Sequence, residues 1–143
     1  MKKFVRKRVR KYGLRSQNFI SYFKAEKLLK SKGIVLNDRN KNCLYMHNSR
    51  ESMKHWFVKT LLFKILRRKG RTVGTEIETK RGIVDLIDVN NLIVYEIESN
   101  LTEKIAKEKI NQFNFAKDVF LVDVKKIPND LNKAEKCLRK IVI

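Results

Sequence analysis

Three apolar segments follow one another closely in the middle of the chain, and they constrain the fold more than any other feature. The segments Thr72–Thr79, Ile83–Val89 and Leu92–Glu98 are rich in Ile, Val and Leu, and only the short turns Lys80–Gly82 and Asn90–Asn91 separate them. Strands joined by turns this short pair as antiparallel neighbours. The sequence therefore predicts a three-stranded antiparallel meander at the centre of the fold.

Helical patterns flank the meander on both sides. Before it, apolar residues at helical spacing predict a helix from a cap at Ser49 to Arg68. The expected fold class is α/β (α+β), with a core over residues 49–143 in the order helix, three strands, helix, strand, helix. The elements expected after the meander are a helix over Thr102–Ala116, a strand over Val119–Val122 and a helix over Asn129–Lys140.

Positive charge is concentrated at the N-terminus. Residues 1–42 contain 14 Lys and Arg against two acids and therefore supply 12 of the 19 net positive charges. Within this region, residues 1–15 carry eight basic side chains and no acid, a composition typical of a flexible basic arm. Such a surplus repels itself unless a polyanion screens it, and nucleic acid is the commonest polyanion inside cells. We therefore expect DNA as the partner, with RNA as the alternative.

A basic helix and hairpin are expected over residues 16–48. Ser16 is a candidate N-cap for a helix over Gln17–Lys32. Two apolar segments, Ile34–Leu36 and Cys43–Met46, then flank a polar turn and predict a hairpin with a basic loop. This unit is similar to the recognition helix and wing of winged-helix DNA-binding domains. A simple basic helix and hairpin beside the main domain is the alternative.

The expected phosphate contacts are the basic side chains of the arm and of the hairpin loop. They are Lys2, Lys3, Arg6, Lys7, Arg8, Arg10, Lys11, Arg15, Arg39 and Lys41.

No apolar run approaches the roughly 20 residues of a membrane span, and the N-terminus is not patterned as an export signal. We therefore expect a cytoplasmic chain with no membrane partner.

Acidic residues gather in the meander of a chain that is basic almost everywhere else. Asp85 lies within an apolar strand, where an uncompensated carboxylate is costly to bury. Glu96 and Glu98 fall on one face of their strand, where like charges repel unless a cation lies between them. Mg²⁺ is a cation that carboxylates hold well, whereas the alternative is a solvated face whose acids pair with nearby lysines and arginines. Six of the 15 acids belong to this group: Glu76, Glu78, Asp85, Asp88, Glu96 and Glu98.

A second polar face is expected on the helix that precedes the meander. Glu51, His55 and Lys59 are four residues apart and share one face of a helix. Either this face looks into a cleft, or it is solvated and holds an ordinary contact between Glu51 and His55.

The segments Gly82–Asp88 and Ile93–Glu98 resemble the core signature of the PD-(D/E)XK nuclease superfamily. This superfamily includes restriction endonucleases and archaeal Holliday-junction resolvases, and the order of the expected elements matches it over residues 49–143. The resemblance implies a restriction-endonuclease-like core, a Mg²⁺ or Mn²⁺ cofactor, and hydrolysis of phosphodiester bonds in DNA, including structured or branched DNA.

The resemblance also implies metal ligands. Asp85 takes the place of the central ligand, Glu96 that of the acid on the third strand, and the carbonyl of Ile97 that of a further ligand. Glu51 is the preferred first acid, and Glu78 and Glu76 are the alternatives.

The chain departs from the family at Glu98, where the family usually has Lys. Either Glu98 serves as a ligand in a Glu-x-Glu variant, or the site has decayed and is kept for binding. A positively charged side chain in place of the family's Lys is expected from Lys109, one turn before Gln112 on the next helix, or from Lys59.

Two functions from different classes follow. The leading hypothesis is a metal-dependent endonuclease, which the retention of every carboxylate favours. The alternative is a non-catalytic DNA-binding protein or transcription regulator, such as a decayed nuclease fold, which the missing Lys favours. A homodimer is a further possibility. Two cuts in a duplex need two active sites, which favours a dimer, but the sequence has no heptad pattern that would form its interface.

Overall fold

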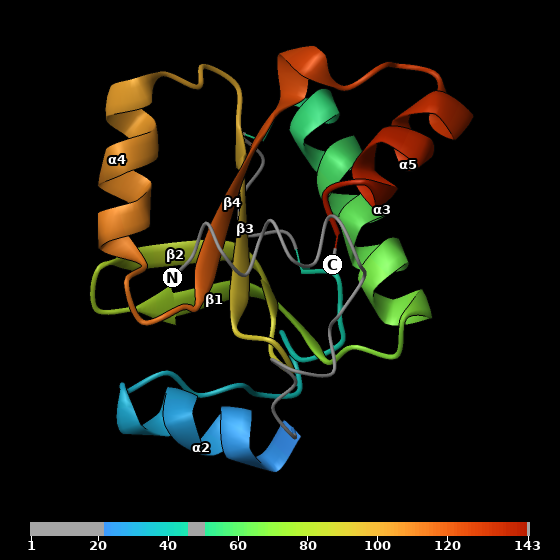
Figure 1. The fold of residues 1–143 in the computed structure, drawn as a ribbon. Coiled ribbons are helices and arrows are strands. Elements are labelled where there is room, and N and C mark those ends of the chain that lie inside the picture. The colour runs from blue at the N-terminus through green and yellow to red at the C-terminus, as the bar shows by residue number, and fades with distance from the viewer. Residues whose placement is uncertain (1–21, 46–50, 143) are drawn as a thin grey trace.

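A four-stranded mixed sheet forms the centre of the molecule (Figure 1). The structure, a computed structural model, describes residues 22–45 and 51–142 of the 143-residue chain. The mixed α and β class expected from the sequence is confirmed. The strands are β1 (Val73–Thr79), β2 (Gly82–Asp88), β3 (Ile93–Glu98) and β4 (Asp118–Asp123).

The strands lie in the order β1-β2-β3-β4. The pairs β1/β2 and β2/β3 are antiparallel, so the predicted meander is confirmed, whereas β4 runs parallel to β3. A parallel neighbour needs a crossover connection, and the segment that contains α4 (Glu103–Gln112) supplies it.

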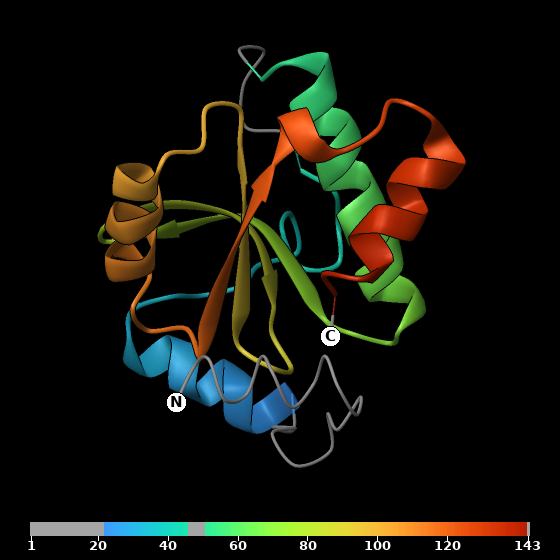
Figure 2. The ribbon, with the colours of Figure 1, turned by 45° about the horizontal axis from the view of Figure 1, so that its top comes forward.

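Helices cover both faces of the sheet (Figures 1 and 2). On one face, α3 (Met53–Arg68) and α5 (Leu131–Arg139) pack against each other and against the strands. On the other side lie α4 and α2 (Tyr22–Ser31), and α2 covers the end of the sheet near the β2–β3 turn. No helix of the described residues is long and apolar enough to cross a membrane.

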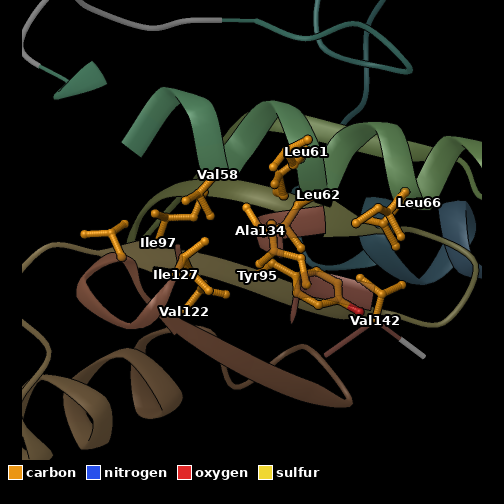
Figure 3. Close-up of a cluster of buried hydrophobic side chains, with 14 of the residues drawn as sticks. Val58, Leu61, Leu62, Leu66, Tyr95, Ile97, Val122, Ile127, Ala134 and Val142 are labelled. Carbon is orange, nitrogen blue, oxygen red and sulfur yellow. The ribbon is translucent and has the colours of Figure 1, made fainter. Parts of the chain in front are cut away.

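The core under α3 and α5 is a continuous apolar cluster (Figure 3). Leu62 and Leu66 of α3 are fully buried, and they lie above Tyr95 of β3 in the same cluster as Ala134 of α5. Full burial of a leucine side chain contributes about 1.5–3 kcal/mol. This packing anchors α3, whose N-terminal half carries the polar residues described below.

The hairpin predicted over residues 34–46 is wrong, because residues 34–45 form no strand. Asn37 instead closes a turn, with its Oδ1 accepting hydrogen bonds from two backbone N–H groups, at 2.9 Å and 3.2 Å. Asn42 pairs with Val73 of β1 through both its N–H and its Oδ1, at 2.7 Å and 2.8 Å. Asparagine side chains that bond backbone groups compete with strand pairing, so this segment lies along β1 and forms no wing.

Several predicted boundaries shift. α4 ends at Gln112 and not at Ala116, because the chain turns there to bury Phe113 in the cluster next to α2. Ser52, and not Ser49, caps α3, so Glu51 precedes the helix. The basic arm, Ser16 and Ser49 lie outside the described residues.

Candidate metal centre

A polar cleft of about 430 Å³ opens where the end of β3, the start of α3 and α4 meet. Its lining comes from elements far apart in the sequence and includes His55, Asp85, Glu96, Glu98, Asn100 and Lys109. Three acids of the meander, Asp85, Glu96 and Glu98, therefore meet His55 of α3 at one place.

Strands β2 and β3 separate at this cleft. Their backbone pairing ends at Leu86 and Tyr95. Beyond it, the N–H of Asp85 donates to Glu96 Oε2 at 2.7 Å, and the N–H of Ile97 donates to Asp85 Oδ2 at 2.9 Å. Each carboxylate thus satisfies a backbone donor that the ladder leaves unpaired. These two bonds hold both acids in a fixed orientation at the mouth of the split.

Glu51 and His55 approach Asp85 from the α3 side. The cap Ser52 accepts a hydrogen bond from the N–H of His55 at 3.0 Å and so fixes the first turn of α3. His55 Nε2 lies 3.6 Å from Glu51 Oε1 and 3.8 Å from Asp85 Oδ1. One ligand atom from each of the three residues lies within 4.8 Å of the others.

Two buried polar atoms in this group have no hydrogen-bond partner, His55 Nε2 and Glu51 Oε2. Leaving a buried polar atom unpaired costs about 1–3 kcal/mol. Burial lowers the pKa of His55, but the carboxylates of Asp85 and Glu51 outweigh it and raise the pKa above 6.5. Burial also opposes ionisation of Asp85, yet His55 and the N–H of Ile97 hold its pKa below the usual value. The group therefore combines two carboxylates with an imidazole, and Glu51 Oε2 is left without a partner.

Glu96 lies deeper and is almost completely buried. Burial, and next the charge of Asp85, raise its pKa to about 8, although Lys109 partly offsets both. Lys109 Nζ reaches over from α4 and lies 3.1 Å from Glu96 Oε1 and 3.6 Å from Glu98 Oε1. Burial works against the charge of Lys109, but these carboxylates outweigh it and raise the pKa of the ammonium.

Lys59 lies behind the cleft and is completely buried. Its Nζ donates to the carbonyl of Tyr45 at 2.9 Å and to the carboxylate of Glu76, and it lies 3.5 Å from Glu51 Oε1. Glu76 takes the left-handed conformation, with φ of 50°, and interrupts the pairing of β1 with β2 opposite Asp85. Such a conformation costs about 1–3 kcal/mol in a non-glycine residue. Lys59 and Glu76 therefore form a buried support for Glu51 and have no access to the cleft.

Asp85, Glu96 and Glu98 line the cleft, and Glu51 lies beside it next to His55, whereas three other predicted residues lie elsewhere. Gln112 donates from Nε2 to the carbonyl of Arg81 at the β1–β2 turn. Glu78 is exposed on β1, and Glu76 bonds to Lys59. Ile97 lines the cleft, and its N–H is engaged by Asp85.

The sequence left the role of His55 undecided between a cleft and a solvated face. In the structure His55 lines the cleft and also lies 3.6 Å from Glu51, so it combines a cleft position with the expected contact. Of the predicted phosphate contacts, Arg39 is exposed and stacks over the Tyr45 ring at 5.2 Å, and Lys41 bridges to β1. The contacts from Lys2 to Arg15 lie outside the described residues.

The cleft fits a divalent cation. Carboxylates suit Mg²⁺ and Mn²⁺, and an imidazole suits transition metals. The unpaired atoms of His55 and Glu51 point to the same conclusion, because a cation between them would satisfy both. No family model, curated protein or solved structure matches this chain.

Proposed function

We propose that the chain is a metal-dependent nuclease of the PD-(D/E)XK type that hydrolyses phosphodiester bonds in DNA. The observation that carries the proposal is the split between β2 and β3, where Asp85 and Glu96 are held beside the unpaired ligand atoms of Glu51 and His55. The order helix, three strands, helix, parallel strand, helix supports a restriction-endonuclease-like core.

Asp85 is the central ligand in this proposal, with Glu51 and His55 on the α3 side and Glu96 on the β3 side. Ile97, through its carbonyl, stays a proposed further ligand. A bound Mg²⁺ or Mn²⁺ supplies an acidified water and neutralises charge on the phosphate. The protein residues hold the cation, orient the phosphodiester and keep Lys109 beside it.

Lys109 takes the part of the lysine that the family usually has at the position of Glu98. Its Nζ contacts Glu96 from a neighbouring helix, and Glu98 stabilises it there at 3.6 Å. Because its pKa is raised, Lys109 is charged at neutral pH. We therefore assign it the role of a hydrogen-bond donor to the phosphate or the attacking water, and not that of a general base. Glu98 is its positioning residue in this proposal.

The test compares wild type with Asp85→Asn. The amide that this substitution introduces keeps an oxygen as an acceptor for the N–H of Ile97, so the fold is preserved while the charge is removed. Glu103→Gln is a matched control, because Glu103 is an exposed acid at the start of α4. We expect cleavage by wild type and by Glu103→Gln in Mg²⁺ or Mn²⁺, no cleavage by Asp85→Asn, and no cleavage in EDTA.

The substrates are single-stranded, duplex and four-way DNA, and binding is measured in parallel by gel shift. We expect Asp85→Asn to bind as tightly as wild type or more tightly, because a carboxylate that faces phosphates is removed. Undiminished cleavage by Asp85→Asn contradicts the assignment of the site. If wild type cleaves none of these substrates, the proposed nuclease activity is contradicted and the non-catalytic DNA-binding function is favoured.

A further inference from the structure

A second groove, of about 140 Å³, is lined by residues that follow α2, by the β1–β2 turn and by the end of α4. Figure 2 shows these three segments close to one another. Its lining combines basic and polar side chains from segments distant in sequence with the apolar Ile34 and Phe115. The basic and polar residues are Lys32, Thr79, Lys80, Arg81, Gln112 and Asn114. Gln112 is one helical turn beyond Lys109 on α4. The groove is therefore a neighbour of the metal cleft.

The groove is cationic and contains no carboxylate in its lining. Within residues 22–45 and 51–142, Lys32, Lys80 and Arg81 form no ion pair with an acid. The nearby acid Glu26 pairs with Lys30 at 3.7 Å, and Glu78 is exposed on β1 but does not line the groove. Positive charge in the groove is thus left uncompensated by the described part of the protein.

The β1–β2 turn is held in place against α4, so the groove is built before any ligand arrives. Arg81 Nη1 donates to the carbonyl of Asn111 at 3.2 Å, and Gln112 donates back to the carbonyl of Arg81. Thr79 Oγ1 closes the turn by accepting from the N–H of Arg81 at 3.1 Å and donating to the carbonyl of Gly82 at 2.7 Å. A fixed cation site loses less conformational entropy on binding than a free lysine does.

We propose that this groove binds a phosphodiester group of the same nucleic-acid strand that occupies the metal cleft. The proposal rests on the nuclease function and extends it to a second contact. Gly82 lies three residues from Asp85 along β2, a span of about 10 Å. A span of this length corresponds to a short stretch of one DNA strand, so a single backbone can reach both the groove and the metal cleft.

Lysine and arginine donors with amide side chains beside them are the groups that contact phosphate oxygens. Contacts of this kind fix the position of a strand without reading its sequence. The groove therefore fixes the position of the DNA strand over Asp85, and we expect it to bind DNA without sequence preference.

The test is the double variant Lys32→Ala/Lys80→Ala, which leaves Arg81 and its hydrogen bonds intact. The matched control is Lys133→Ala/Lys136→Ala, which removes two exposed lysines from α5 beyond the opposite face of the sheet. Binding to duplex DNA is measured by fluorescence anisotropy in EDTA over a series of salt concentrations. We expect the slope of log affinity against log salt to fall by about 1 in the groove variant, as for one lost phosphate contact, and to change less in the control.

If the slope of log affinity against log salt is equal for the two double variants, the proposed phosphate contact in the groove is contradicted. Cleavage by wild type in Mn²⁺, measured on the same DNA, reports on the nuclease separately, because the binding assay contains no metal. A groove variant with a reduced slope and a slower cleavage at subsaturating DNA supports the second contact. Thermal unfolding of both variants verifies that neither loses its fold.

Discussion

Two lysine–carboxylate pairs lie on either side of Asp85, and burial separates their roles. On the α3 side, the side chain of Lys59 is 0% exposed and is enclosed by Glu76 and the carbonyl of Tyr45. On the α4 side, the side chain of Lys109 is 28% exposed and lines the cleft. The same two residue types thus build a buried support in one place and an accessible cleft wall in the other.

The difference between the pairs is one of desolvation. A lysine with no contact with water needs polar partners within the protein, and Lys59 Nζ has hydrogen bonds to Tyr45 and Glu76 and lies 3.5 Å from Glu51. Lys109 needs fewer partners within the protein because water reaches it. The cleft therefore has a rigid wall on the α3 side and a more accessible one on the α4 side.

The largest expected effect comes from removing the buried lysine. Lys59→Met leaves the buried carboxylate of Glu76 without its counterion, and the loss of one partner of a buried pair costs about 3–5 kcal/mol. We expect the free energy of unfolding in urea to fall by that amount. Lys64→Met is the matched control on the same helix, because the Lys64 side chain is 42% exposed and pairs with Glu135, a pair that contributes about 0–1 kcal/mol.

The double variant Lys59→Met/Glu76→Gln sharpens this result. If the cost of Lys59→Met arises from an unpaired charge, neutralising Glu76 restores a large part of the lost stability. A loss in Lys59→Met no greater than that in Lys64→Met contradicts the role of Lys59 as a buried support.

The next effect is on catalysis and not on stability. Lys109→Met removes the accessible cation, and we expect the rate of cleavage at saturating DNA to fall about 100-fold or more. Stability changes little, because Glu96, with a pKa of about 8, already holds a proton at neutral pH and is not left as an unpaired charge when Lys109 is removed. Single-turnover cleavage and urea unfolding measure the two quantities. If Lys109→Met cleaves DNA at the wild-type rate, a group other than Lys109 supplies the positive charge.

The sheet was predictable from the sequence because its signals are local. Two short turns between apolar segments specify the meander, and the register follows from their length. The hairpin over residues 34–46 failed for the opposite reason. Asn37 and Asn42 carry side chains that bond backbone groups, and the pairing of Asn42 with Val73 joins segments that no local pattern connects.

The candidate site was predictable only in part. Asp85 and Glu96 were identifiable because an acid within an apolar strand is costly without a partner. Lys59 and Lys109 were indistinguishable as replacement cations, because burial is a property of the packed structure and not of spacing along one helix. The position of Gln112 on the same helix face as Lys109 suggested a place in the cleft, but the β1–β2 turn binds its amide instead.

The smallest expected effect concerns the proton on Glu96. Burial raises the pKa of Glu96 to about 8 in the folded protein, well above its value in the unfolded chain. Between these two pKa values the folded state holds a proton that the unfolded state releases, so the stability contributed by this proton is lost as the pH rises. For the metal-free protein, we expect the free energy of unfolding to fall by about 1 kcal/mol from pH 6.5 to 7.5 through this group. Glu96→Gln removes that dependence, while Glu103→Gln retains it and serves as the control. His55 is present in both variants, so its own titration cancels in the comparison, and equal pH profiles for Glu96→Gln and wild type contradict the assignment of the proton to Glu96.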